Sequence, residues 1–127
     1  MPIRKEPLHF GLPYEKEGYG FAQGIKTGDT IYLSGQVAAD RHGADMEAQM
    51  RQAYASIAKS LAEYGATMEN VVDEIIFVTD IKTAAAVAGK VRAEAYFGLP
   101  VVASTLIHVA DFSSPDLLVE IKCVAKV

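Results

Sequence analysis

A single carboxylate, Glu120, lies in a C-terminal segment, residues 117–121, whose other members are all aliphatic. We expect this segment to be part of a β-strand, because aliphatic and β-branched residues favour strands. A carboxylate in such a strand must be solvated, paired with a cation or used in chemistry. A partly buried carboxylate can orient a water molecule and accept its proton, as a general base does. Glu120 is therefore the first candidate for a catalytic residue.

The other chemically capable side chains are isolated from one another. His9, His42 and His108 lack the spacing of metal ligands, so we expect no metal site. Cys123 alternates with apolar residues near the C-terminus and is expected to be a small buried hydrophobe. No glycine-rich segment precedes a predicted helix, so we expect no phosphate-binding loop and no cofactor.

The length and composition indicate one domain over residues 1–127. Half of the residues are apolar and 22% are charged, which suits a single folded core. The net charge of −4 opposes binding to phosphate backbones, so nucleic acid is not an expected partner. A lone cysteine fits a reducing compartment. With no signal-peptide pattern and no bilayer-length apolar run, we expect a cytoplasmic protein without a membrane partner.

The predicted strands fall at both ends of the chain and in its middle. Residues 19–26 and 30–36 have the pattern of an antiparallel pair, and Gly28 supplies the positive φ that a tight turn between them requires. The other predicted strands are residues 71–79, 102–109 and 117–126. We expect the last two of these to form a β-hairpin.

Two helices are predicted between the strands. Asp45 can cap the N-terminus of a helix that runs to Tyr64, and Gly65 is placed to end it. Apolar residues recur within it at steps of three and four, which gives one buried stripe. Thr83 is the expected cap of a second helix over residues 84–97. The order predicts an α+β fold with both helices on one face of the sheet.

The second face of this sheet has no predicted cover. One face of the last strand is apolar and should lie beneath the helices: Leu117, Val119, Ile121, Cys123, Ala125 and Val127. The other carries Leu118, Glu120, Lys122, Val124 and Lys126, and we expect Ser104, Leu106 and His108 of the preceding strand beside them. Such a mixed face predicts a homo-oligomer with Glu120 near its interface. The alternative is a solvated face with scattered aliphatic residues.

Four segments resemble, in order and spacing, the RidA/YjgF family of imine and enamine deaminases, which is also known as L-PSP endoribonuclease-like. These segments are Tyr19-Gly20-Phe21-Ala22-Gln23-Gly24, Ser34-Gly35-Gln36, Phe77-Val78-Thr79-Asp80 and Val119-Glu120-Ile121. The resemblance implies a chorismate-mutase-like fold and a homotrimer with ligand clefts between its subunits. In deaminases of this family, an arginine binds the substrate carboxylate and a glutamate positions the attacking water. Glu120 matches that glutamate, and Ser34 and Gly35 match residues that line the cleft.

The chain departs from the family pattern at three places. Ser104 stands where the arginine belongs, Phe21 where a tyrosine is usual, and Ala88 at or near a common asparagine. Because a guanidinium binds a carboxylate through two charge-assisted hydrogen bonds, its loss should weaken the binding of carboxylate-bearing imines. Lys122 is a candidate replacement cation, but pairing with Glu120 or exposure to solvent explains it more simply.

Three functions remain open from the sequence. The first is hydrolysis of a small imine or enamine, with Glu120 positioning water and Phe21, Ser34, Gly35 and Ser104 contacting the ligand. The second is binding of a metabolite without catalysis. The third is a ribonuclease or inhibitor of translation, which the acidic charge disfavours.

Overall fold

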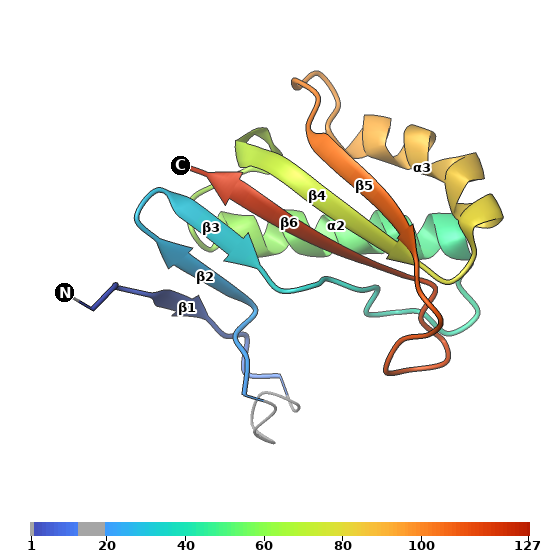
Figure 1. Ribbon diagram of the computed structural model, residues 1–127, viewed down its shortest axis with the longest axis horizontal. Helices are drawn as coiled ribbons and strands as arrows, with labels where there is room; N and C mark the ends of the chain where they lie inside the picture. The colour runs from blue at the N-terminus through green and yellow to red at the C-terminus, as the bar shows by residue number, and fades with distance from the viewer. Residues whose placement is uncertain (1, 13–19) are drawn as a thin grey trace.

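The computed structural model describes residues 2–12 and 20–127. Within these residues it shows a six-stranded sheet with two long helices packed on one of its faces (Figure 1). The strands are β1 (Glu6–Leu8), β2 (Gly24–Thr27), β3 (Thr30–Leu33), β4 (Val71–Val78), β5 (Ala103–His108) and β6 (Val119–Lys126). The helices are α2 (Met46–Ala62), α3 (Ile81–Ala95) and a short 3-10 turn, η1 (Met68–Asn70). The expected α+β fold is confirmed.

The strand order is β1-β2-β3-β6-β4-β5, with β4 and β5 parallel and the other neighbours antiparallel. The predicted hairpin of β5 and β6 is therefore wrong, because β4 lies between them (Figure 1). The helix α3 provides the crossover that two parallel strands require. Sequence proximity alone favoured a hairpin, whereas β6 pairs with β3 and β4.

The inserted strand changes which residues share a face. Ile76 of β4 pairs with Ile121 of β6 on one side and with Leu106 of β5 on the other, so Leu106 lies on the helix-covered face. Ser104 and His108 alternate with Leu106 and belong to that face as well. The expectation that these three residues of β5 accompany Glu120 is wrong. Glu120 instead shares its row with Phe77 and Ile107.

Local signals explain most of the element boundaries. The β2–β3 turn contains Gly28 at φ +57°, as expected. β2 begins only at Gly24, while Tyr19 lies outside the described residues. β3 ends at Leu33, beyond which Gln36 forms an isolated bridge to β6.

The two helices begin at aspartate caps. The carboxylate of Asp45 accepts a hydrogen bond from the Ala48 amide at 2.9 Å, as the sequence predicts for α2. The expected Thr83 cap of α3 is wrong: Asp80 caps the helix by accepting from the Thr83 amide at 3.1 Å, so α3 starts three residues earlier. Asp is as good a cap as Thr, and the pattern did not separate them.

The core lies between the sheet and the two helices. It includes the predicted stripe of α2 and the inward side chains of β6, among them Ile57, Leu61, Val119 and Ile121. The opposite face of the sheet, which we call the open face, carries Tyr32 and Ile107 with 48% and 41% of their surfaces exposed. In the parts of the chain that the structure describes, no helix is long and apolar enough to cross a membrane.

Candidate functional site

Glu120 lies on the open face and packs against the backbone of Gly35. A Cβ atom added at Gly35 would lie 2.5 Å from the Glu120 carboxyl carbon and 2.6 Å from its Oε2, which real contacts do not allow. The carboxylate therefore occupies the space that a side chain at position 35 would fill. The structure thus brings together Glu120 and Gly35, two of the residues predicted from the sequence. Glycine is required at position 35 because any side chain there would clash with the Glu120 carboxylate.

The segment around Gly35 is held firmly against β6. The backbone amide of Gln36 donates to the Ile121 carbonyl at 2.8 Å, and the Ile121 amide donates back to Gln36 at 2.9 Å. The Gln36 side chain is buried; it donates to the Ser34 carbonyl at 2.9 Å and accepts from the Ser56 hydroxyl at 2.7 Å. These bonds fix the peptide beside Glu120, which is the preorganisation that a catalytic carboxylate needs.

Three other residues considered in the sequence analysis are connected with the segment around Gly35 or with its neighbours. The Ser34 hydroxyl donates to the Ala22 carbonyl at 2.6 Å, so it joins the loop before β2 to the Gly35 peptide. Phe21 precedes Ala22 and exposes 48% of its surface. Lys122 donates to the Leu33 carbonyl at 3.1 Å. Its charge is therefore anchored on the backbone, two residues along β6 from Glu120.

The environment of Glu120 favours its neutral form. Partial burial raises the pKa of the Glu120 carboxyl above its usual range, and the positive charge of Lys122 offsets part of this rise. A base with a raised pKa accepts a proton from water more readily than an ordinary carboxylate does. The geometry and the pKa direction both suit a carboxylate that activates water.

The raised pKa predicts that Glu120→Gln stabilises the protein at neutral pH. Between pH 4.5, the usual value, and the raised folded pKa, the unfolded chain loses a proton that the folded protein keeps, so ionisation costs stability as pH rises. Glutamine removes this cost. Thermal unfolding should give a higher midpoint for the variant at pH 7, and the difference should vanish below pH 4. A lower midpoint at pH 7 would show that the carboxylate is favourably paired.

Ser104 lies in a different environment from Glu120. Its hydroxyl donates at 2.6 Å to Glu74 of β4, whose side chain is fully buried. Glu74 also accepts from the hydroxyls of Tyr54 at 2.8 Å and Tyr96 at 2.7 Å, and from Arg92 Nε at 3.1 Å. Within one chain, Ser104 and Glu120 are on opposite faces of the sheet and do not form one site. Ala88 is buried in α3 and offers no polar group.

Glu74 and its four donors form a buried cluster that the sequence reasoning missed. The four partners come from α2, from α3 and the Tyr96 that caps its C-terminus, and from β5, so no sequence spacing connects them. A signal was present nevertheless: Glu74 occupies an inward position of a strand otherwise rich in aliphatic residues, as Glu120 occupies a position in β6. A buried carboxylate is tolerated only when it is fully hydrogen-bonded, and four donors satisfy it.

The cluster predicts a loss of stability in alkali. Burial raises the pKa of Tyr54 and of Tyr96 above the usual 10.0, and the negative charge of Glu74 raises both further. Above pH 10 the unfolded chain therefore releases protons that the folded protein retains, and stability falls as pH rises. We expect cooperative unfolding in this range, accompanied by a late rise in tyrosinate absorbance.

Tyr32→Phe on the open face is the matched control for this titration, since Tyr32 has no contact with the cluster. It should leave the pH of unfolding unchanged, whereas Tyr96→Phe should alter it. Ionisation of every tyrosine near pH 10 without unfolding would contradict the buried arrangement.

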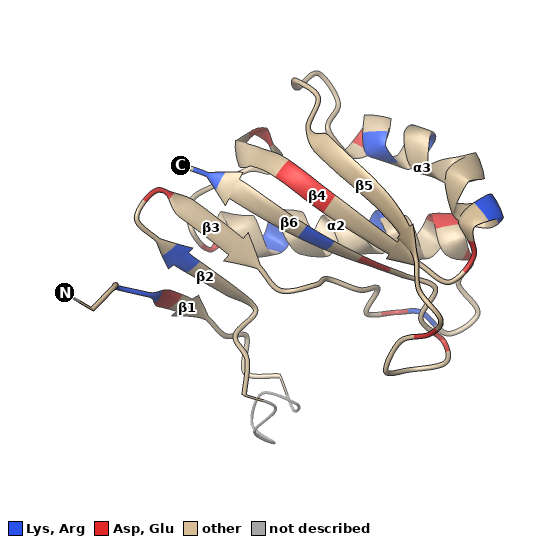
Figure 2. Cartoon of the chain, in the orientation of Figure 1, with Lys and Arg blue, Asp and Glu red and all other residues tan. Residues whose placement is uncertain are grey.

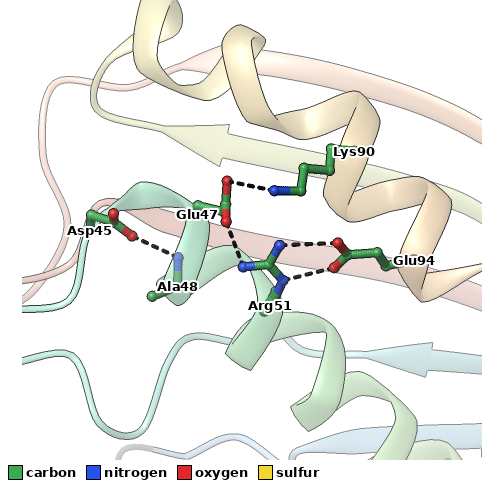
Figure 3. A network of polar contacts seen from close by, with 6 residues as sticks. All are labelled: Asp45, Glu47, Ala48, Arg51, Lys90 and Glu94. Atoms are coloured by element: carbon green, nitrogen blue, oxygen red, sulfur yellow. Dashed lines mark hydrogen bonds and ion pairs between the residues drawn. The ribbon is translucent and has the colours of Figure 1, made fainter.

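The outer surfaces of the two helices are joined by ion pairs rather than by a site. Arg51 of α2 lies between Glu47 and Glu94 (Figure 3), with Nη1 2.6 Å from Glu47 Oε2 and Nε 2.7 Å from Glu94 Oε2. Lys90 approaches Glu47 at 3.6 Å. Exposed pairs of this kind add little stability, and here they link the outer surfaces of α2 and α3. Among the described residues no group of three potential ligands could hold a metal ion.

Comparison with known proteins supports the fold and the family. Residues 16–127 match the model of the family described as endoribonuclease L-PSP. The crystal structure of Rv2704 from Mycobacterium tuberculosis, described as a member of the YjgF/YER057c/UK114 family, is 30% identical and superposes with a TM-score of 0.86; the match covers 98% of this chain and all of that one. YyfA of the Rid family from Yersinia pestis is 26% identical, with a TM-score of 0.78 over 86% of this chain and 89% of its own.

RidA from an Antarctic Psychrobacter species shows the same fold at 22% identity, with a TM-score of 0.78 over all of this chain and 99% of that one. The order of segments quoted from the sequence, the mixed sheet with two helices on one face and the match over nearly the whole chain agree with one another. The chain belongs to the endoribonuclease L-PSP family, also known as the YjgF or RidA family.

Proposed function

We propose that this protein is a homotrimeric hydrolase that deaminates a small imine or enamine in a cleft between subunits, with Glu120 as the residue that activates water. The observation that carries this proposal is the Glu120 carboxylate, partly buried on the open face and seated in the space left by Gly35. Gly35 borders this carboxylate, Ser34 precedes Gly35 and bonds to Ala22, and Phe21 is adjacent to Ala22, so we expect these three residues to contact the ligand.

The open face supports an assembly that closes this position from solvent. Its middle rows hold Ile75 and Phe77 of β4 and Ile107 of β5, and no helix or strand within residues 2–12 and 20–127 covers them. Apolar residues of this kind on a sheet are usually buried against a partner. A neighbouring copy packed there would turn the shallow surface at Glu120 into a cleft, and burial would hold its pKa high.

The chemistry follows from one carboxylate and one water. Glu120 in its ionised form takes a proton from water while the oxygen adds to the imine carbon. The proton then passes to the nitrogen, which gives a tetrahedral adduct with one hydroxyl and one amino group. Glu120 next takes the hydroxyl proton and delivers it to the amino nitrogen, the C–N bond breaks to release ammonia, and a carbonyl compound remains. Glu120 acts first as base and then as acid, and each proton-transfer role contributes typically 10²–10⁴-fold to the rate.

Among the described residues of one chain, the cation whose charge acts on Glu120 is Lys122 and not an arginine. Position 104 is a serine whose hydroxyl is engaged by Glu74 on the other face of its own chain, so it would reach this cleft only across a subunit boundary. Lys122 is held by a backbone carbonyl. We therefore propose an imine without a carboxylate next to the reacting carbon as the preferred substrate class.

Ammonia release tests this proposal with two imines. A flavin amine oxidase generates an imine without a carboxylate, and an amino-acid oxidase generates 2-iminopropionate. We expect the protein to accelerate ammonia release from the first and to have little effect on the second. Gly35→Ala should abolish the acceleration at little cost in stability, since the flexible carboxylate moves away. Acceleration that persists in Gly35→Ala would contradict the placement of the site.

Binding without catalysis is the outcome if wild-type protein binds such compounds but releases no ammonia above the background rate. RNA is not the proposed substrate, although the family name refers to a ribonuclease. The net charge is −4, and Figure 2 shows the drawn Lys and Arg residues dispersed over β2, β6, α2 and α3 rather than on one surface element.

A further inference from the structure

The segment that follows β3 leaves the regular ladder between β3 and β6. The two strands pair as far as Tyr32 and Val124, and the pairing resumes at the isolated bridge of Gln36 and Ile121. From the first pair to the second, the segment after β3 advances by four residues and β6 by three. One extra residue therefore makes residues 33–35 a β-bulge, which we call the bulge. Bulges re-aim side chains and backbone beside functional sites.

Lys122 of β6 holds this bulge from one side. Its Nζ donates to the carbonyl of Leu33, the first residue of the bulge, at 3.1 Å. The other side is held by Ser34, whose amide donates to the Gln23 carbonyl at 2.9 Å and whose hydroxyl donates to the Ala22 carbonyl at 2.6 Å. The last residue of the bulge is the glycine that packs against the proposed catalytic carboxylate. The ammonium group of Lys122 therefore helps to set where that glycine lies.

The same ammonium group acts on Glu120 through its charge. Lys122 and Glu120 are two residues apart on one face of β6, which is about 7 Å along a strand. This separation is shorter than the Debye length of about 8 Å at physiological ionic strength, so salt does not screen the interaction fully. Burial raises the pKa of Glu120, and the positive charge of Lys122 opposes part of this rise. The bond to the Leu33 carbonyl keeps that charge in a fixed place.

The neighbours of Glu120 on other elements are uncharged in the described part of the chain. In its own row they are Phe77 of β4 and Ile107 of β5, neither of which titrates. The bulge consists of a leucine, a serine and a glycine, so it has no ionisable side chain. Asp73 of β4 is the next acid on this face and lies two rows away. The anchored ammonium group is thus the charge closest to the carboxylate.

We propose that Lys122 is a positioning residue for the hydrolysis proposed above: its ammonium group fixes the bulge beside Glu120 and keeps that carboxylate ionised, so that it can take a proton from water. The catalytic consequence rests on the proposed function, whereas the coupling between the two side chains does not. Without the positive charge, the carboxylate should hold its proton to higher pH. Because only the ionised form can act as the base, activity should then be lost on the acidic side of the pH profile.

Titration of Glu120 by carbon-13 nuclear magnetic resonance tests the coupling on the whole protein. Lys122→Met keeps an unbranched side chain without the charge, so the Glu120 midpoint should move to higher pH and the Gly35 amide signal should change. Lys122→Arg restores the charge and should keep the midpoint close to that of the wild type. Lys126→Met is the matched control and should leave the midpoint unchanged. Lys126 lies on the same face of β6 but about 20 Å from Glu120, beyond the Debye length, and it binds the β2–β3 turn.

The pH dependence of ammonia release tests the consequence for catalysis. The acidic limb of kcat/KM for the carboxylate-free imine should move to higher pH in Lys122→Met, by the same interval as the Glu120 midpoint, because kcat/KM reports the ionisation of the free enzyme. Lys122→Arg should restore the wild-type profile. A rate that falls equally at every pH in Lys122→Met would contradict the electrostatic role.

An unchanged Glu120 midpoint in Lys122→Met, or an equal rise in Lys126→Met, would overturn the proposal. A shifted midpoint in a protein whose wild type releases no ammonia would support the coupling and refute the proposed hydrolysis. If Lys122→Met does not fold, Lys122→Gln removes the charge while it keeps a donor for the Leu33 carbonyl. It should raise the midpoint as well, and an unchanged midpoint in that variant would equally overturn the role of Lys122.

Discussion

Replacing Glu74 by glutamine should lower the free energy of unfolding by about 2–4 kcal/mol, the largest stability effect that we expect from a substitution of similar size. Glu74 is fully buried and accepts four hydrogen bonds from three elements. Glutamine retains the shape but loses the charge that pairs with Arg92. Its NH₂ group can only donate, so it cannot accept the hydrogen bonds that one of the Glu74 oxygens accepts. The cost is below that of a wholly buried pair because Arg92 can turn towards solvent.

Denaturant unfolding of Glu74→Gln and Glu94→Gln measures this effect. Glu94 makes an ion pair with Arg51 on the helix surface, so its substitution removes the same charge without disturbing a buried group. The midpoint for Glu94→Gln should stay close to that of the wild type. Equal midpoints for the two variants would mean that the buried cluster does not stabilise the fold.

Introducing an acid at Ile107 on the open face should dissociate the proposed trimer. Ile107 is 41% exposed in the single chain and shares a row with Phe77 and Glu120. Full burial of an exposed side chain of this size contributes about 1.5–3 kcal/mol, of which the interface would supply the part for the surface still exposed. An aspartate would replace that gain with the cost of an unpaired charge. In a cyclic trimer this loss occurs in every subunit.

Light scattering on Ile107→Asp and Ile81→Asp distinguishes loss of a subunit interface from a general effect of placing an acid at an exposed isoleucine. Ile81 is also 41% exposed, but it begins α3 on the other side of the sheet. We expect Ile81→Asp to retain three times the 13.7 kDa subunit mass and Ile107→Asp to approach that subunit mass. A trimer that survives Ile107→Asp would place the interface elsewhere.

Local patterns predicted the elements well because their causes are local. The caps, the apolar stripe of α2 and the glycine turn of β2–β3 depend on residues within a few positions of each other, and Asp45, Gly28 and Gly65 act as expected. Strand β1 escaped notice because three residues, including a proline, carry almost no pattern. Its pairing with β2 depends on the finished sheet.

The placement of Ser104 could not be predicted because it depends on strand order. Two strands that follow each other closely were expected to pair, yet β4 separates them. The register of β5 on β4 places Ser104 opposite Glu74, so its side chain lies on the face of Glu74 and not on that of Glu120. The family resemblance indicated that Ser104 replaces the arginine of the family pattern. The structure adds that Ser104 and the guanidinium of Arg92 both donate to Glu74.

The contact between Glu120 and Gly35 was predictable only in part. The resemblance connected both residues with one cleft, and the structure supplies a physical reason: the carboxylate fills the space above a residue without a side chain. The pKa of Glu120 is raised because the carboxyl is partly buried on a sheet face. The alternating pattern of the strand indicates the face, but it does not give the extent of burial.

Ammonia release by Glu120→Gln from the carboxylate-free imine tests the central claim most directly. The variant keeps the shape of the side chain, and a measured thermal midpoint at or above that of the wild type would exclude unfolding as a cause of lost activity. We predict that the variant remains trimeric by light scattering and releases ammonia at least about 100-fold more slowly than the wild type. Wild-type turnover in a trimeric Glu120→Gln variant would contradict the role of Glu120 as the residue that activates water.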